Sequence, residues 1–145
     1  MSYDFEVSAV LPATPDEIFD AWMSSDGHTA MTGAEAHVDP RVGGEFDAWD
    51  GYIGGQTVAL ERGRRIVQTW RSSEFEDAHA DSQIEVILVP DGQGTRITVR
   101  HANVPDGQLG YEQGGWQESY FEPMRGYFAR PRRSVDSTGP TGSSA

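Results

Sequence analysis

Apolar and polar positions alternate along several short stretches of the chain, as they do in strands with one buried face. The first is residues 3–11, where every second residue is apolar. After residue 34 the pattern recurs between Asp-Gly, Gly-Gly and Arg-Gly dipeptides, which favour tight turns. We therefore expect a meander of six or seven antiparallel strands, whose later members are residues 35–39, 43–49, 52–60, 65–71, 83–89 and 95–102.

Two short helices are expected between the first two strands. Thr14-Pro15-Asp16-Glu17 forms a capping box, with Thr14 as N-cap and Glu17 three residues later. Ile18, Phe19 and Trp22 then supply an apolar stripe, which residues 24–27 should interrupt. A second helical turn is expected at residues 28–31, ending at Thr32-Gly33.

The last apolar pattern has a helical period and covers residues 113–128. Trp116, Tyr120, Met124 and Tyr127 recur at spacings of three and four residues, which places them on one helical face. Pro123 should kink this helix, because proline removes a backbone donor at a cost of about 3 kcal/mol when nothing compensates. The pattern predicts one domain over residues 1–130 and a disordered tail over residues 131–145, which is poor in apolar residues.

Composition narrows the possible partners and locations. The net charge is −12, with 11 basic residues that are all arginine, so phosphate backbones and anionic membranes should be repelled, whereas a basic protein should be attracted. Because cysteine is absent, thiol nucleophiles and disulfides are excluded. The chain start lacks the features of a signal peptide, and no apolar run approaches the ~20 residues that span a bilayer. A cytoplasmic location is expected.

An ordered series of short motifs resembles the helix-grip domains of the START-like or SRPBCC superfamily, which includes the birch-pollen allergens. Within it the chain resembles the family named for the activator of heat-shock-protein-90 ATPase, in particular the C-terminal domain of that co-chaperone and its stand-alone bacterial relatives. The resemblance is carried by Pro15-Asp16-Glu17-Ile18-Phe19, Thr32-Gly33, Gly43-Gly44-Glu45-Phe46, Asp50-Gly51-Tyr52-Ile53-Gly54-Gly55, Ile66-Val67-Gln68-Thr69-Trp70-Arg71, Gly94-Thr95-Arg96-Ile97, Gly115-Trp116 and Tyr120-Phe121-Glu122-Pro123. It implies an α+β helix-grip (START/Bet v 1-like) fold, with a curved antiparallel sheet around a long C-terminal helix and two short helices after the first strand.

A helix-grip fold implies a cavity between the concave face of the sheet and the C-terminal helix. Strand alternation and helical spacing predict the residues that face it, namely Phe46, Gln68, Trp70, Ile84, Val99, His101, Trp116, Tyr120 and Met124. The alternative is that these side chains fill a packed core. In a cavity, Gln68 and His101 would hold the polar group of a ligand. In a packed core they would bond Tyr120, Ser82 or buried water. Trp49 breaks the strand alternation and has no predicted place.

Three functions remain open. The first is binding of a small hydrophobic or aromatic molecule, without catalysis or cofactor. The second is a chaperone-associated interaction module, for which the acidic loop 72–82 offers an exposed and mobile contact surface. The third is a cyclase-like or hydrolase-like enzyme with His101 as general base, assisted by Tyr120. His37 and Asp39 offer two metal ligands but no third, so no metal site is expected.

Overall fold

A seven-stranded antiparallel sheet is the scaffold of the chain in the computed structural model, which describes residues 2–76, 78–105, 111 and 114–129. The strand order is β1-β7-β6-β5-β4-β3-β2, so neighbours in the sequence are mostly neighbours in the sheet. The strands are β1 (Ser2–Leu11), β2 (His37–Val38), β3 (Glu45–Ala48), β4 (Ile53–Glu61), β5 (Arg65–Ser72), β6 (Ser82–Asp91) and β7 (Gly94–Pro105). The predicted meander and fold class are confirmed.

Helices α1 (Pro15–Trp22) and α2 (Ser25–Thr32) follow β1, as predicted. The capping box is present, since Thr14 Oγ1 accepts from Glu17 N at 3.1 Å and Glu17 Oε1 accepts from Thr14 N at 2.9 Å. The expected interruption at residues 24–27 is wrong in extent. Ser24 caps α2 by accepting from the Gly27 N–H at 2.9 Å, so residues 25–27 form its first turn.

The C-terminal helix contains a π-helical segment, η2 (Gln117–Phe121), followed by α3 (Glu122–Ala129). Glu122 donates its backbone N–H to Gln117 O, five residues back. Pro123 has no N–H to continue an α-helical ladder, and the wider π turn lies directly before it. The predicted first residue of this helix, Gln113, and the predicted tail over residues 131–145 lie outside the described residues.

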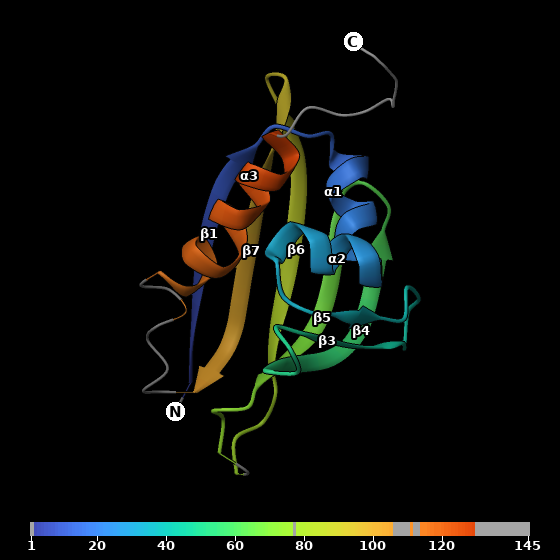
Figure 1. Cartoon of the computed structure of the whole chain (residues 1–145). Helices are drawn as coiled ribbons and strands as arrows, with labels where there is room; N and C mark the ends of the chain where they lie inside the picture. Colours follow the sequence, from blue (N-terminus) through green and yellow to red (C-terminus); the bar gives the residue numbers. More distant parts are fainter. Residues whose placement is uncertain (1, 77, 106–110, 112–113, 130–145) are drawn as a thin grey trace.

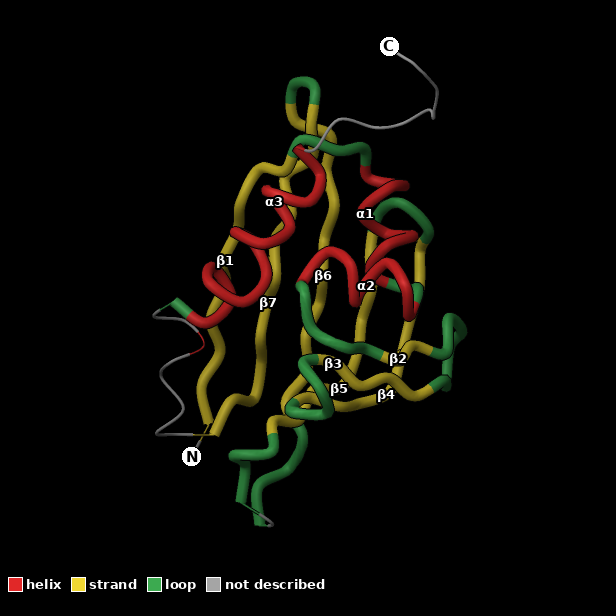
Figure 2. The backbone as a smooth tube through the Cα atoms, viewed as in Figure 1, coloured by secondary structure: helices red, strands yellow, loops and turns green. Residues whose placement is uncertain are grey.

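All the helices lie on one face of the curved sheet (Figures 1 and 2). α3 crosses in front of β1 and β7, while α1 and α2 lie over the other half of the sheet (Figure 1). The inner sheet face is apolar and buried at the positions that alternation predicts, including Ile66, Ile84, Val86 and Val99. Trp116, Tyr120, Phe121, Met124 and Phe128 cover it from the helix. No helix in the described ranges is long and apolar enough to cross a membrane.

The loop between β5 and β6 differs from its prediction as a solvated segment. Phe75 is buried within it, at 6% exposure, and packs against Trp70 with ring centroids 6.1 Å apart. Arg71 donates to the carbonyl oxygens of Glu76 at 2.8 Å and His79 at 2.7 Å. Phe75 and Arg71 therefore hold in place a loop whose composition predicted only exposed residues.

Candidate functional site

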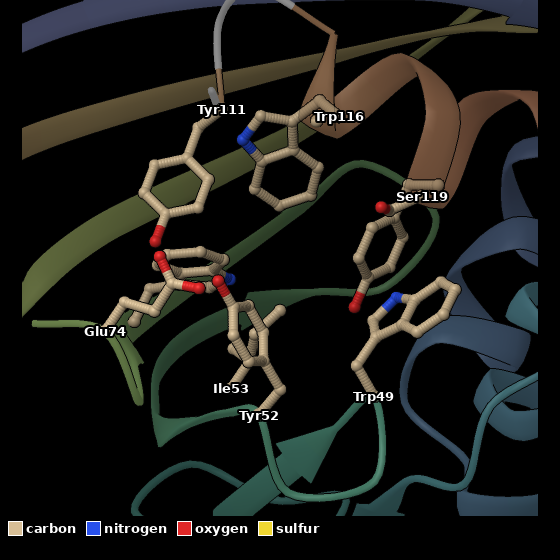
Figure 3. A pocket seen from close by; sticks show the side chains of 10 residues that line it. Trp49, Tyr52, Ile53, Glu74, Tyr111, Trp116 and Ser119 are labelled. Carbon is tan, nitrogen blue, oxygen red and sulfur yellow. The ribbon is translucent and has the colours of Figure 1, made fainter. Parts of the chain in front are cut away.

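An aromatic cavity of about 600 Å³ lies between the C-terminal helix and one end of the sheet (Figure 3). Three of the four tryptophans and three of the five tyrosines of the chain contribute to its wall. Its lining consists of Trp49, Tyr52, Ile53, Trp70, Glu74, Tyr111, Gly115, Trp116, Ser119 and Tyr120. These residues come from the β3–β4 turn, the start of β4, β5, the loop after β5, and the helix with the residues that precede it.

The β3–β4 turn carries Trp49 and Tyr52 into the cavity wall. Its backbone is left-handed at three consecutive residues, with φ of 55° at Trp49, 57° at Asp50 and 87° at Gly51. Asp and Gly tolerate this region, whereas a bulky tryptophan is strained there. The turn is held because Asp50 N donates to Glu35 O at 2.9 Å and Glu35 N donates to Asp50 Oδ1 at 3.0 Å.

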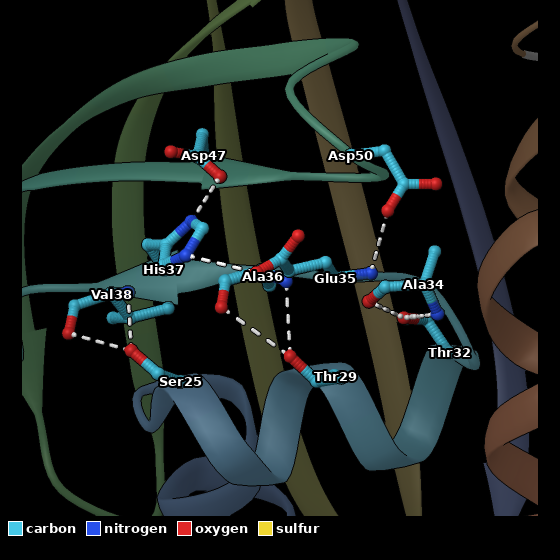
Figure 4. A network of polar contacts seen from close by, with 10 residues as sticks. All are labelled: Ser25, Thr29, Thr32, Ala34, Glu35, Ala36, His37, Val38, Asp47 and Asp50. Atoms are coloured by element: carbon cyan, nitrogen blue, oxygen red, sulfur yellow. Dashed lines mark hydrogen bonds and ion pairs between the residues drawn. The ribbon is translucent and has the colours of Figure 1, made fainter.

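The segment that holds this turn is itself bonded to α2 (Figure 4). Thr29 Oγ1 accepts from Ala36 N at 2.9 Å, and Ser25 Oγ accepts from Val38 N at 2.8 Å. The backbone N–H groups of Glu35 and Ala36 thus bond side chains, and β2 (His37–Val38) is shorter than the predicted strand 35–39. A continuous series of contacts thus runs from α2 through Glu35 and Asp50 to Trp49.

The Trp49 indole N–H is buried and has no hydrogen-bond partner among the described residues. The indole nitrogen points toward the interior of the cavity (Figure 3). An unsatisfied buried donor costs about 1–3 kcal/mol. Because the nitrogen is closed off even to water-sized groups, a ligand in the cavity could bond it only after the indole ring moves.

The rings of the wall meet one another edge to face or at a tilt. Trp70 and Tyr111 are 5.0 Å apart between centroids with an interplanar angle of 81°. Trp116 lies 5.9 Å from Trp70 at 39° and 5.0 Å from Tyr120 at 42°. Such offset contacts stabilise aromatic clusters beyond the area they bury.

Polar groups gather at one side of the cavity. The Tyr111 and Tyr52 hydroxyls and the Glu74 carboxylate lie near one another (Figure 3). Burial raises the pKa of Tyr111 well above its usual range, hydrogen bonding to Ser72 lowers it, and neighbouring Tyr52 and Glu74 raise it further. The phenol therefore stays neutral beside an acidic side chain.

His101 lies behind the cavity wall in a directional chain of hydrogen bonds. Trp116 Nε1–H donates to His101 Nδ1 at 3.2 Å, His101 Nε2 lies 2.8 Å from Ser82 Oγ, and Ser82 Oγ donates to Trp70 O at 2.6 Å. Because Nδ1 accepts and Ser82 uses its own hydrogen on the carbonyl, the imidazole is neutral with its proton on Nε2. Burial lowers the pKa of His101 to about 3. Both ring nitrogens are occupied, which does not favour His101 as a general base.

Tyr120 bonds a different histidine from the one the enzyme hypothesis requires. Its hydroxyl lies 2.8 Å from His28 Nε2, and His28 Nδ1 lies 3.0 Å from Trp22 O. Since a carbonyl only accepts, Nδ1 carries the proton and Tyr120 donates to Nε2. Burial lowers the pKa of His28 and raises that of Tyr120. The expected assistance of His101 by Tyr120 is therefore wrong.

Gln68 is also committed to protein partners. Its Oε1 accepts from Trp22 Nε1 at 3.2 Å, and its Nε2 donates to Thr57 Oγ1 at 3.2 Å. The amide therefore connects α1 to β4 across the core. The bonds satisfy a buried polar group that would otherwise be costly.

Three of the nine predicted cavity residues line the cavity, namely Trp70, Trp116 and Tyr120. The other six are buried in the surrounding core, outside this lining: Phe46, Gln68, Ile84, Val99, His101 and Met124. Sequence reasoning did not find Trp49, Tyr52, Glu74 and Tyr111. The Asp50-Gly51 turn signal beside Trp49 and Tyr52 was available, whereas Glu74 and Tyr111 lie where periodicity carries no information.

The hydrogen bond from Trp116 to His101 should contribute to the stability of the fold. Trp116→Phe removes the indole donor and leaves His101 Nδ1 buried without a partner, so it should lower the free energy of unfolding by about 1–3 kcal/mol. Trp49→Phe is the matched control, because it loses a donor that bonds no described residue. Urea unfolding of both variants measures the difference. Equal losses would contradict the assigned role of the Trp116 indole.

Metal chemistry finds no support in the part of the chain that the structure describes. It contains no group of three or more His, Asp and Glu residues that could hold a metal ion. His37 instead bonds Asp47 Oδ1 at 3.0 Å and lies 3.3 Å from Glu35 Oε2 at the surface.

Several proteins of known sequence are similar to this chain. An activator of 90 kDa heat shock protein ATPase homolog from Dictyostelium discoideum is 23% identical over 117 residues, which cover 80% of this chain and 30% of the relative. Homolog 2 from Mus musculus is 22% identical over 120 residues, covering 83% and 36%. The chain therefore spans about a third of the length of these curated relatives.

Solved structures share the fold. An HSP90 activator from Plasmodium falciparum superposes with a TM-score of 0.79 at 22% identity, covering 90% of this chain and 99% of that one. CalU16 from Micromonospora echinospora superposes with a TM-score of 0.71 at 23% identity, covering 87% and 76%. Residues 12–129, well over half of the chain, match the family described as Activator of Hsp90 ATPase homolog 1-like protein. With this match and the helix-grip architecture, the chain belongs to that family.

Proposed function

We propose that this protein binds a small organic molecule in its aromatic cavity and does not transform it. The observation that carries the proposal is the cavity itself, whose volume of about 600 Å³ falls within the roughly 300–1,000 Å³ typical of ligand sites. Its wall is mostly aromatic and carries a few convergent polar groups, as ligand sites usually do.

Binding without catalysis is favoured by the state of the nearby titratable groups. The nitrogens of His28 and His101 are engaged with protein atoms, and burial lowers the pKa of each histidine. Among the described lining residues, Glu74 supplies the carboxylate, with no second one beside it. Neither histidine is therefore free to take a proton from a bound molecule, and the paired carboxylates that often carry acid–base chemistry are not present in the described lining.

A variant that fills the cavity tests the proposal. Ser119 lies on η2 and lines the cavity, so Ser119→Leu should occupy part of its volume. In a thermal-shift screen of lipids, flavonoids and small aromatic compounds, we expect the unchanged protein to be stabilised by a subset of compounds, because binding only the native state raises stability. The same compounds should bind Ser119→Leu at least about tenfold more weakly, so that about tenfold more compound is needed for the same stabilisation. This corresponds to a loss of binding free energy on the order of 1.4 kcal/mol.

Ser119→Ala is the control for this test, since it removes the hydroxyl without filling space. It should keep the response to the stabilising compounds. A screen in which no compound stabilises the unchanged protein would overturn the proposal, as would compounds that act equally on Ser119→Leu.

A second candidate function is binding to a chaperone of the 90 kDa heat-shock class. It is favoured by the family match and by the Plasmodium falciparum HSP90 activator, which this chain covers almost completely. The net charge of −12 suits a basic partner surface, and such attraction weakens with salt.

The chaperone function is tested by the ATPase rate of a purified chaperone of this class, with and without the protein, at about 50 and 300 mM salt. Stimulation that falls as salt rises is the expected result. An unchanged ATPase rate, together with no complex at low salt, would remove this candidate.

A further inference from the structure

We propose that the aromatic cavity selects an organic cation, an amine or quaternary ammonium compound. This inference rests on the proposed binding function and names the chemistry of the molecule that binds. It follows from the aromatic wall and from the sign of the charge beside it (Figure 3).

The wall is built from the side chains that attract cations most strongly. Indole and phenol faces carry negative electrostatic potential, and tryptophan is the best of the aromatic side chains at holding a cation over its face. Trp49, Tyr52 and Tyr111 are half-buried and offer part of their surface to the cavity, whereas Trp70, Trp116 and Tyr120, with 3% exposure each, are packed in place. A cluster of tilted aromatic faces is the arrangement by which quaternary ammonium groups are recognised.

The charged group at the cavity has the complementary sign. Glu74 is the acidic member of the lining, and among the described lining residues none is arginine or histidine. The Arg71 side chain nearby is directed elsewhere, to Asp81 at 3.1 Å and to the Glu76 and His79 carbonyl oxygens. No ion pair of the described residues engages Glu74.

An anionic ligand is disfavoured by the same arrangement. A carboxylate or phosphate in the cavity would face Glu74 without a lining cation to balance it, in a protein of net charge −12. A neutral molecule would gain from the apolar wall but not from Glu74. A cation gains from the ring faces and the carboxylate together.

Benzoylcholine is a suitable probe, because it joins an aromatic ring, an ester oxygen and a quaternary ammonium group. Its neutral counterpart, 3,3-dimethylbutyl benzoate, has the same shape with carbon in place of the charged nitrogen. Titration calorimetry with both probes should show that the cation binds at least about fivefold more tightly than the neutral ester. Dihexanoylphosphatidylcholine, which places a phosphate beside the same ammonium group, should bind more weakly than benzoylcholine.

Glu74→Gln tests the role of the carboxylate. It should weaken benzoylcholine binding about two- to fivefold, as expected for a solvent-accessible ion pair, and leave the neutral ester unchanged. Glu76→Gln is the matched control, because Glu76 is an exposed acid of the same loop outside the cavity lining. Its hydrogen bonds to Arg71 and His79 are made by backbone atoms rather than by its carboxylate. It should leave the binding of both probes unchanged.

The outcomes separate this inference from the function on which it rests. Equal binding of benzoylcholine and its neutral counterpart, or equal effects of Glu74→Gln and Glu76→Gln, would overturn cation selection and leave ligand binding standing. Tighter binding of the phospholipid than of benzoylcholine would overturn the assignment to a free organic cation. If neither probe binds and no compound of the thermal-shift screen stabilises the protein, the proposed function and this inference are both overturned.

Discussion

Lowering the pH from 7 to 4 is expected to reduce the free energy of unfolding by about 3 kcal/mol through His101 alone. Burial lowers the pKa of His101 in the folded protein from 6.5 to about 3. Between these values the unfolded chain binds a proton that the native state does not, so stability is lost as the pH falls, at about 1.4 kcal/mol per pH unit. His28 has a pKa lowered in the same direction by burial and adds to the loss.

Urea unfolding at a series of pH values between 7.5 and 4 measures this dependence. His101→Gln removes the titrating imidazole, so its stability should fall less steeply with acid than that of the unchanged protein, whatever its absolute stability. His37→Gln is the control. Hydrogen bonding to Asp47 raises the pKa of this surface histidine. Replacing it should therefore not reduce the loss of stability that occurs as the pH falls. Parallel pH profiles for His101→Gln and the unchanged protein would contradict a buried neutral His101.

Gly55→Ala is expected to destabilise the protein by at least about 3 kcal/mol, a loss at the upper end of what overpacking causes. A Cβ atom at Gly55 would collide with the backbone carbonyl oxygen of Thr69 and lie 2.9 Å from Phe46 Cε1. Because one of these neighbours is backbone of the adjacent strand, a side-chain rotation alone cannot relieve the contact. The strands that support the β3–β4 turn, and with it Trp49, would have to separate.

Gly54→Ala is the matched control for this substitution. The added Cβ there would lie 3.5 Å from Phe46 O, an ordinary contact distance. Thermal and urea unfolding of the two variants should give a large loss for Gly55→Ala and a small one for Gly54→Ala. Similar losses would show that the close approach of β4 and β5 is not what requires glycine at this position.

The scaffold could be predicted because it repeats. Ile84 and Val86 alternate with polar residues on β6, and Trp116 and Tyr120 recur at helical spacing, so their burial followed from period alone. The capping box at Thr14 is equally local, and the structure contains both of its hydrogen bonds. Such signals need no knowledge of distant contacts.

The cavity wall could be predicted only in part, because four of its ten residues lie outside the strands and the C-terminal helix. Trp49 breaks strand alternation because its backbone turns left-handed, and it is held by Asp50 and Glu35. Glu74 and Tyr111 come from segments without periodicity. The hydrogen-bond partners of His101 and Gln68 come from distant parts of the chain, so the sequence alone could not single them out. Ser82, which bonds His101, was among the partners expected for these two residues.

Binding of a small molecule in the aromatic cavity should be visible in the four tryptophan indole N–H signals of a ¹H–¹⁵N correlation spectrum. On titration with the compound that most stabilises the protein, the signals of Trp49, Trp70 and Trp116, which line the cavity, should shift saturably. Trp22 bonds Gln68 outside the cavity lining, and its signal should move least. Indole signals that stay fixed, or a shift largest at Trp22, would contradict binding in the cavity.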